Sequence, residues 1–167
     1  MNILAIETST EVCGIAYFKN DEMEEIEEAE IPRKHAASLP MFYKSLQDKT
    51  NFTLNELDGI AVSIGPGSFT GLRIGLSFAK GLAYSHDLPI IPVPTLQAIA
   101  LNRNHDTPFH VLLFSHRDMI YHQSFSAVGH PILEPEVNKW DDLDSVIGDE
   151  SFFHVNCDNF TKNYSFV

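Results

Sequence analysis

Apolar and polar positions in the first third of the chain follow the pattern of short β-strands. The runs at residues 3–6 and 12–18 are rich in β-forming residues, and residues 22–31 carry the charge typical of an exposed edge strand. Pro32 ends this series, and residues 33–48 change to helical spacing. The apolar positions of this helix share one face: Leu39, Phe42, Tyr43 and Leu46. The pattern therefore predicts three strands followed by an amphipathic helix.

Strands and helices alternate in the next part of the chain. Residues 59–64 predict a buried strand that runs into a glycine turn, and Ser68 after it is a favourable N-cap for a long helix to about Tyr84. A short strand at 90–93 and a helix that fades near Asn102 follow. Residues 1–102 thus predict the order β-β-β-α-β-α-β-α.

A polar stretch at residues 103–108 divides the chain into two parts. The second part predicts two strands, a short helix and a third strand, at 109–114, 120–128, 141–147 and 151–155. This order repeats the start of the first part in shortened form. We therefore expect a first lobe at 1–102 and an abbreviated second lobe at 103–167.

Composition and charge exclude several classes of protein. Lys+Arg 11 against Asp+Glu 23 gives a formal net charge of −12, which makes strong binding of nucleic acid or anionic lipid by this chain alone improbable. Cys13 and Cys157 are too few for a disulfide framework or a Cys-based zinc site. No stretch approaches the roughly 20 apolar residues that span a bilayer, and the first residues lack the basic region of a secretory signal. We expect a cytoplasmic protein.

The most distinctive motif is Gly65-Pro66-Gly67-Ser68-Phe69-Thr70-Gly71-Leu72-Arg73. A strand, a glycine turn and a helix N-terminus can hold an anion with backbone N–H groups. The nucleotide fingerprints are not met, because no Lys follows as in a P-loop and Thr70 stands where a dinucleotide motif has glycine. Thr70 also breaks the Gly-x-Ser-x-Gly pattern of a nucleophile elbow. Anion binding and a tight packing turn remain as two interpretations.

Small residues recur every four positions along the helix that follows this motif: Gly71, Gly75, Ala79 and Ala83. Such a strip lets another backbone approach closely. A glycine inside a helix costs about 1 kcal/mol relative to alanine, so a close contact should offset it. The contact is either within the lobe or with a partner chain, and the sequence leaves both open.

Three groups of residues together resemble the bacterial TsaB (YeaZ) family. They are Ile3-Leu4-Ala5-Ile6-Glu7-Thr8-Ser9, His35 with Leu39-Pro40, and the Gly65 motif with Gly75 and Gly81. The resemblance is dense over residues 1–102 and weaker afterwards, where Ser115-His116-Arg117-Asp118 keeps only the Arg of the family's Asp-Ala-Arg. It implies an α/β fold of the actin-like ATPase, sugar kinase and Hsp70 (ASKHA) class, in two lobes with the second truncated.

The resemblance also implies a function. Proteins of this family are inactive paralogues of the TsaD ATPase that pair with TsaD and the small ATPase TsaE in forming N6-threonylcarbamoyladenosine at position 37 of tRNA. A non-catalytic scaffold is therefore expected, with no cofactor on the isolated chain, because ATP, metal and strong tRNA binding would belong to the partner subunits. The helices at 33–48 and 68–84 would dock against TsaD, or against a second copy in a homodimer. The candidate partner-binding residues are Leu39, Phe42, Tyr43, Gly71, Leu72, Gly75, Leu76 and Ala79, each of which fits the lobe's own core equally well.

Residues of the family motif resemble a vestigial phosphate loop: Glu7, Thr8, Ser9, Thr10, Gly65, Gly67, Ser68 and Arg73. Autonomous ATP hydrolysis is not expected, because the first turn lacks its usual glycine and Ser115 replaces the second-lobe acid. No metal is expected either, because Leu39 stands where a second His would follow His35. The competing class is an enzyme acting on its own, either a small ASKHA phosphotransferase or an M22-like metallopeptidase. ATP binding would favour the first and stoichiometric zinc the second.

Overall fold

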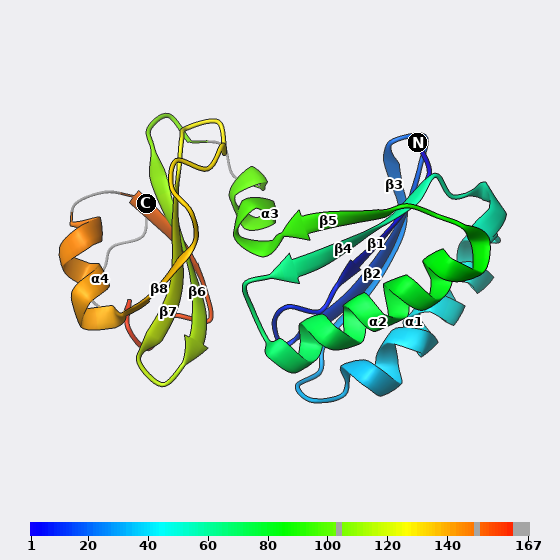
Figure 1. The fold of residues 1–167 in the computed structure, drawn as a ribbon, viewed down its shortest axis with the longest axis horizontal. Helices are drawn as coiled ribbons and strands as arrows, with labels where there is room; N and C mark the ends of the chain where they lie inside the picture. The colour runs from blue at the N-terminus through cyan, green and yellow to red at the C-terminus, as the bar shows by residue number, and fades with distance from the viewer. Residues whose placement is uncertain (103–104, 149–150, 162–167) are drawn as a thin grey trace. The chain divides into compact units, whose positions relative to one another are not determined.

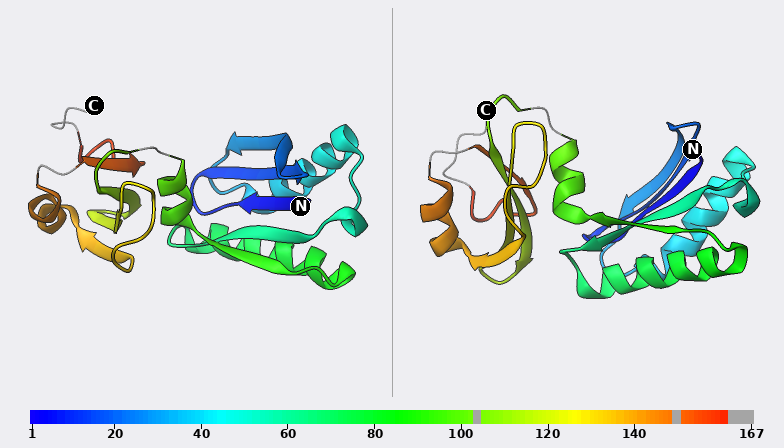
Figure 2. Two further views of the ribbon diagram at one scale, coloured as in Figure 1. Left: turned by 90° about the horizontal axis from the view of Figure 1, so that it is seen from above. Right: turned by 45° about the horizontal axis from the view of Figure 1, so that its top comes forward.

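The computed structural model describes residues 1–102, 105–148 and 151–161 of the chain. The chain divides into two compact units, Met1–Val93 and Pro94–Val167. Each unit contains one β-sheet with helices packed against it (Figures 1 and 2). The first strands of the two sheets are connected in the same way, as the order of the elements in the sequence predicts.

The first unit is a five-stranded sheet with two helices on one face (Figure 1). Its strands are β1 (Ile3–Glu7), β2 (Val12–Lys19), β3 (Glu22–Glu30), β4 (Gly59–Gly65) and β5 (Ile90–Pro94), in the order β3-β2-β1-β4-β5. Its helices are α1 (His35–Thr50), the 3₁₀ turn η1 (Leu54–Glu56) and α2 (Phe69–His86). β1 pairs antiparallel with β2 and parallel with β4, so β1 lies at the centre of the sheet.

The core of the first unit lies between the sheet and the two helices. Alternate residues of the strands point to the helices, because successive side chains of a strand face opposite sides. Leu4 and Ile60 are fully buried there against Leu39 and Leu46 of α1. Burial of each such side chain stabilises the fold by about 1.5–3 kcal/mol. The predicted apolar face of the first helix is therefore confirmed as a core face.

The helix ends follow local sequence signals. Ser68 caps α2 by accepting a hydrogen bond from the Gly71 N–H at 3.2 Å, which confirms the predicted N-cap. Asn51 and Asp87 end α1 and α2 in the left-handed conformation. Both side chains tolerate that conformation better than most residues do. These stops determine the lengths of the two helices.

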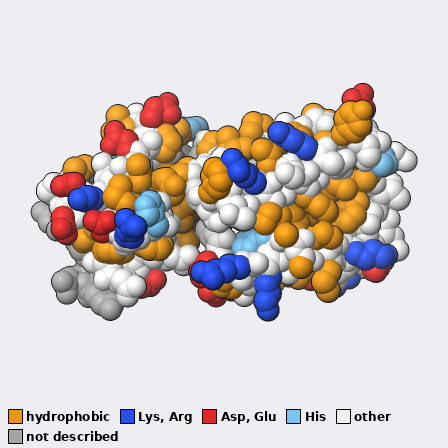
Figure 3. Space-filling view, turned by 60° about the horizontal axis from the view of Figure 1, so that its bottom comes forward, with side chains coloured by type: hydrophobic (Ala, Val, Ile, Leu, Met, Phe, Trp, Pro, Cys, Tyr) orange, Lys and Arg blue, Asp and Glu red, His pale blue; other side chains and the backbone are white. Residues whose placement is uncertain are grey.

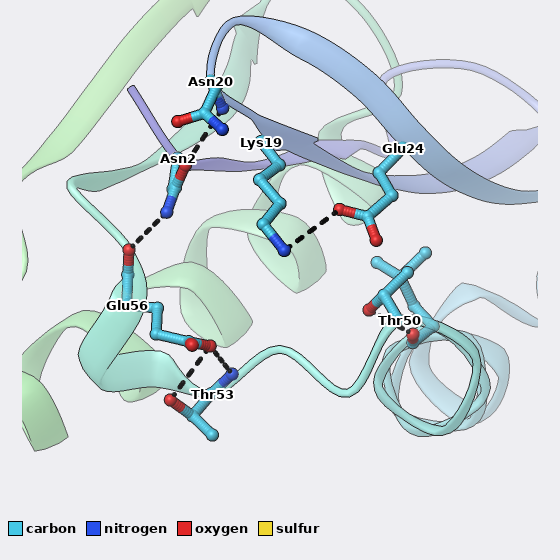
Figure 4. A network of polar contacts seen from close by, with 8 residues as sticks. Asn2, Lys19, Asn20, Glu24, Thr50, Thr53 and Glu56 are labelled. Carbon is cyan, nitrogen blue, oxygen red and sulfur yellow. Dashed lines mark hydrogen bonds and ion pairs between the residues drawn. The ribbon is translucent and has the colours of Figure 1, made fainter.

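Polar contacts tie the beginning of β1 to the neighbouring turns (Figure 4). The Asn2 side chain donates to the Glu56 carbonyl at 3.0 Å and accepts from the Asn20 N–H at 3.1 Å. The Glu56 carboxylate in turn accepts the Thr53 N–H at 2.8 Å and forms a capping box with it. One amide side chain thus joins the β2–β3 hairpin to the 3₁₀ turn η1.

The second unit is a four-stranded sheet with one helix packed on each of its two faces. Its strands are β6 (Phe109–His116), β7 (Met119–Phe125), β8 (Glu136–Lys139) and β9 (Ser151–Val155), in the order β8-β7-β6-β9. Its helices are α3 (Thr95–Leu101) and α4 (Trp140–Ile147). β6 pairs antiparallel with β7 and parallel with β9, as β1 does with β2 and β4.

Three details of the second unit differ from the sequence prediction. α3 was expected in the first lobe, but Leu96 and Ala100 are fully buried against Phe109 and Phe125 of the second sheet, so the division lies at Val93/Pro94 instead of residue 102. The strand predicted at 120–128 ends at Phe125, because a turn closed by a hydrogen bond from the Gly129 N–H to the Ser126 carbonyl follows it. β8 was not predicted.

None of the helices in the described ranges is long and apolar enough to cross a membrane.

Candidate functional site

Two turns of the first unit lie against each other, and both belong to the predicted family motif. Thr8 and Ser9, after β1, are 0% and 2% exposed. The Ser68 N–H, at the start of α2, donates to the Ser9 carbonyl at 2.6 Å, and the Thr8 N–H reaches Ser63 Oγ at 3.4 Å. The structure thus brings the hydroxyl run and the glycine turn together, although they are far apart in the sequence.

Several backbone N–H groups of these turns are already used within the chain. The Ser9 N–H donates to the Glu7 carboxylate, and the Val12 N–H donates to Thr10 Oγ1 at 3.2 Å. A phosphate cradle needs N–H groups that point to the ligand, and a carboxylate within the turn would repel an anion. In this arrangement the two turns join β1 to the start of α2, and neither Ser9 nor Ser68 offers its N–H to a phosphate.

Arg73, the charged residue at the end of the motif, lies on the exposed side of α2. Its guanidinium is 3.7 Å from the centre of the Phe69 ring, a cation–π contact. Arg73 also lines the groove between α1 and α2, together with Phe69. It therefore belongs to the surface of the helices and not to the buried contact between the two turns.

The strip of small residues on α2 packs inside its own unit. Gly71, Gly75, Ala79 and Ala83 are buried. A Cβ on Gly71 would overlap the Thr8 carbonyl oxygen, and a Cβ on Gly75 would overlap Thr8 Oγ1. Of the two interpretations that the strip left open, the structure favours close packing within the lobe. Gly71, Gly75 and Ala79 therefore do not face outward as partner contacts.

The other predicted partner-binding residues lie in or beside the same core. Leu39 is 0% exposed, and Phe42, Tyr43, Leu72 and Leu76 are half-buried. Tyr43 makes edge-to-face contacts with the rings of Phe52 and Phe78, at 5.9 and 5.7 Å between centroids. Most of these side chains hold α1 and α2 on the sheet.

A groove between the outward sides of α1 and α2 was not predicted from the helical periodicity. It is lined by Ala36, Leu39, Pro40, Phe69, Ile74 and Phe78. Three apolar side chains on these helices are strongly exposed: Met41 at 69%, Phe69 at 67% and Tyr84 at 93%. Figure 3 shows hydrophobic side chains gathered on this face of the molecule. Exposed apolar side chains gathered on one face are a feature of interaction sites. The sequence signal for this groove was the presence of apolar residues on both sides of α1.

Several histidines of the described residues have structural contacts. His35 is buried at the start of α1, and its Nε2–H donates to the Val12 carbonyl at 3.2 Å. His110 Nδ1 and His122 Nε2 are 2.7 Å apart in the buried part of the second sheet. Burial, with the nearby His110, lowers the pKa of His122 to about 4, so that this ring stays neutral at pH 7.

Metal-ligating clusters are not found among the residues whose positions are described: no group of three His, Cys, Asp or Glu side chains there could hold an ion. Ser115, which replaces the second-lobe acid, lies with its Oγ 3.0 Å from His116 Nδ1 near the end of β6. Burial raises the pKa of the Cys13 thiol to about 11 and that of Cys157 to about 12. Both thiols are therefore protonated at pH 7 and poor nucleophiles.

Comparison with known proteins agrees with this architecture. The family model for TsaD, tRNA N6-adenosine threonylcarbamoyltransferase, matches residues 27–154. The chain belongs to the TsaD family, among its TsaB/YeaZ members. It is 40% identical over 100 residues to the tRNA threonylcarbamoyladenosine biosynthesis protein TsaB of Haemophilus influenzae, and 38% identical over 100 residues to that of Escherichia coli. These matches cover 60% of this chain and 42–43% of the relatives, so the matched part spans less than half of their length.

Solved structures of the TsaB/YeaZ family share the fold over most of this chain. A Pseudomonas aeruginosa protein with similarity to peptidase YeaZ superposes with a TM-score of 0.80 at 25% identity, covering 92% of this chain and 74% of that protein. YeaZ of the same organism superposes with a TM-score of 0.75, covering 85% and 69%. The predicted α/β fold of the ASKHA class is confirmed.

Proposed function

We propose that this TsaB/YeaZ family chain is a non-catalytic partner subunit in the formation of N6-threonylcarbamoyladenosine in tRNA. The names of its TsaB relatives support a place in this biosynthesis. The observation that carries the proposed role is the apolar groove on the outward face of α1 and α2. We place the docking of a TsaD-family protein on this face.

The shape and composition of this face suit another pair of helices. The groove runs between two helices, and an apolar helix surface laid along it would complete a four-helix bundle. Phe69 and Tyr84 project from α2, and Met41 from α1. Exposed aromatic side chains of this size commonly contribute most of the binding energy of an interface. Docking would remove these side chains from water.

The non-catalytic role is supported by how the two motif turns are used. The N–H groups of Thr8, Ser9 and Ser68 are bonded to other groups of this chain, so these three N–H groups are not offered to the phosphates of ATP. We therefore assign ATP, metal and the binding of tRNA to the partner subunits, a TsaD-like ATPase and a TsaE-like ATPase. Among the residues that the structure describes, no observation favours the phosphotransferase or the metallopeptidase alternative.

Binding to the TsaD-family protein of the same cell tests the proposal. The affinity of the purified pair would be measured by calorimetry, with threonylcarbamoylated tRNA as the functional readout. Phe69→Ala should weaken binding by about tenfold or more, because truncation of an aromatic residue buried in an interface typically costs over ~1 kcal/mol. Leu133→Ala is the matched control, since Leu133 is 60% exposed in the second unit. Wild-type chain that neither binds the TsaD-family protein nor supports the modified tRNA would disprove the proposal.

A further inference from the structure

The first sheet has a back face, on the side away from α1 and α2, that neither helix of its unit covers. Both helices pack on the other side of the sheet (Figures 1 and 2). Successive side chains of a strand point to opposite sides, so the residues between the buried core positions belong to the back face. β1 reads Ile-Leu-Ala-Ile-Glu, an apolar run typical of a strand that is buried on both faces. The sequence of the central strand therefore suits a sheet that is covered on both sides.

A row of small and apolar side chains crosses the middle of the back face. The strand register places Ala61, Ala5, Ala16 and Ile26 side by side on β4, β1, β2 and β3. The Ile26 side chain is exposed at the edge of this row. A layer of secondary structure normally buries the apolar face of a sheet, and three neighbouring alanines let such a layer approach closely.

Two carboxylates stand on either side of a glycine in the next row of the back face. Glu7 on β1 pairs with Gly14 on β2, and Gly14 pairs with Glu28 on β3. A Cβ on Gly14 would lie 3.6 Å from the Glu28 Cβ and 3.9 Å from the Glu7 Cβ, so both side chains border the space that the glycine leaves. Neither carboxylate forms an ion pair with a residue in the described part of the chain. A glycine inside a strand often marks a place where a ligand or another chain comes close.

These two rows line one pocket, which we call the back-face pocket. All five strands of the first sheet contribute to it, and its polar side chains are Glu7, Glu28 and Ser63. Lys, Arg and His are absent from its lining. Its volume of about 180 Å³ is smaller than the roughly 300–1,000 Å³ of pockets that hold drug-sized ligands. A single long side chain suits this volume better than an independent small molecule does.

We propose that the back-face pocket receives an arginine side chain from an apolar helix of a partner protein. The methylene groups of the arginine would lie on the alanine row, and its guanidinium would reach Glu7 and Glu28. Arginine suits this place better than lysine, because its planar guanidinium presents several N–H donors to carboxylates and is less strongly hydrated. The inference does not depend on docking through α1 and α2, since the pocket lies on the opposite face of the sheet.

The charge of the pocket distinguishes this occupant from a second copy of the chain and from nucleic acid. Two copies laid back face to back face would bring their pairs of carboxylates together, and like charges in an interface reduce affinity. The same carboxylates repel the phosphates of a nucleic acid. A cationic side chain surrounded by apolar residues matches both the carboxylates and the alanine row.

Fluorescence anisotropy with a labelled helical peptide provides the first test. The peptide is about 18 residues long, which is enough to form a helix, with Ala and Leu on one side, Gln on the other and one Arg at the centre of the apolar side. A second peptide carries Gln in place of the Arg. We expect saturable binding of the Arg peptide, and binding at least about tenfold weaker for the Gln peptide, because its amide leaves the carboxylates without a cationic partner.

Variants of the protein provide the second test. Glu28→Gln should weaken binding of the Arg peptide about tenfold and leave binding of the Gln peptide near its wild-type value. Glu22→Gln is the matched control, because Glu22 is exposed at the other end of the same strand. Glu28 is preferred to Glu7 for this substitution, since the Glu7 carboxylate also accepts the Ser9 N–H.

Gly14→Ala separates a binding role of the glycine from a structural one. The nearest atom to the added methyl group would be 3.6 Å away, an ordinary contact, and alanine loses less conformational freedom than glycine. The midpoint of thermal unfolding should therefore stay at or above the wild-type value. Binding of the Arg peptide should nevertheless fall, because the methyl group occupies the space between the two carboxylates.

Several results would overturn the inference. It fails if neither peptide binds, if both bind equally, or if Glu22→Gln weakens binding as much as Glu28→Gln does. Self-association in sedimentation velocity that Glu28→Gln or Gly14→Ala abolishes would assign the back face to a second copy and also overturn it. Phe69→Ala should leave peptide binding unchanged, so that failure of docking through α1 and α2 is distinguished from failure of this inference.

Discussion

Thr8, at the start of the first unit's hydroxyl turn, packs directly on the backbone of α2 at Gly75. The contact is close enough that a Cβ on residue 75 would overlap Thr8 Oγ1. Thr8 is 0% exposed, and its Oγ1 has no hydrogen-bond partner among the described residues. The glycine is therefore required by a neighbouring side chain of the same lobe. The exposed residues of α2 lie on its other side.

Gly75→Ala should destabilise the protein even though alanine is the better helix former. The added methyl group overpacks the contact with Thr8, which typically costs about 1–3 kcal/mol. Thermal and urea unfolding would measure the change. Gly81→Ala is the matched control on the same helix, because a Cβ there meets nothing within 4 Å, and it should stabilise by about 0.5–1 kcal/mol.

A double-mutant cycle identifies the cause of the Gly75→Ala effect. If the overlap with Thr8 is responsible, Thr8→Ser removes its methyl group but not the clash, whereas Thr8→Ala should recover part of the lost stability. Equal destabilisation by Gly75→Ala in the wild-type and Thr8→Ala backgrounds would show that Thr8 is not the neighbour that requires glycine.

His122 should make the fold less stable in mild acid. Its pKa is lowered from 6.5 to about 4 by burial and by His110, so the unfolded chain binds a proton more readily than the folded one. The free energy of unfolding is therefore highest above about pH 6.5. It decreases by up to about 3 kcal/mol as the pH falls toward 4. Urea unfolding between pH 7 and 5 measures it. His122→Gln should flatten this slope relative to His116→Gln, an exposed control; equal slopes would contradict the assignment.

Lys49 should link the stability of the first unit to the ionisation of Glu27. Hydrogen bonds from Lys49 and Ser45 lower the pKa of Glu27 below its usual value. The stabilisation that these hydrogen bonds give is present above the ordinary pKa of Glu. It is lost as the pH falls through the lowered pKa of Glu27. Lys49→Met should therefore reduce stability at pH 7 and have a smaller effect in acid. Lys44→Met, which removes a pair within α1, should change stability less. A larger loss for Lys44→Met would refute the link.

The isolated chain should show no saturable binding of Mg·ATP. The N–H groups of Thr8, Ser9 and Ser68 are occupied, and the Glu7 carboxylate lies within the turn that a phosphate would have to enter. Isothermal calorimetry at increasing nucleotide tests this directly. Stoichiometric binding that is lost on Ser68→Ala would show that the turns open to accept a phosphate.

Local sequence patterns predicted most elements of the first unit. The strands at β1, β2 and β4 follow from short apolar runs, and the start of α2 follows from Ser68, because a serine at this position satisfies an N–H that the helix leaves open. β8 was missed, since its sequence Glu-Val-Asn-Lys lacks the β-branched and aromatic density of a strand and pairs with only one neighbour. Proximity to β7 in three dimensions makes it a strand.

The sequence by itself determined the α/β class, the order of the elements and the family resemblance, because these depend on periodicity and on motifs of adjacent residues. Which side of each helix is covered was decided only by the tertiary structure. Periodicity shows that Gly71, Gly75 and Ala79 share a side of α2, but the residue that fills the space beside the two glycines is Thr8, which follows β1. The same holds for α3, which packs on the sheet that follows it in the chain. The free energy of packing depends on contacts between segments distant in the sequence, and these contacts left Phe69 and Tyr84 on the open face.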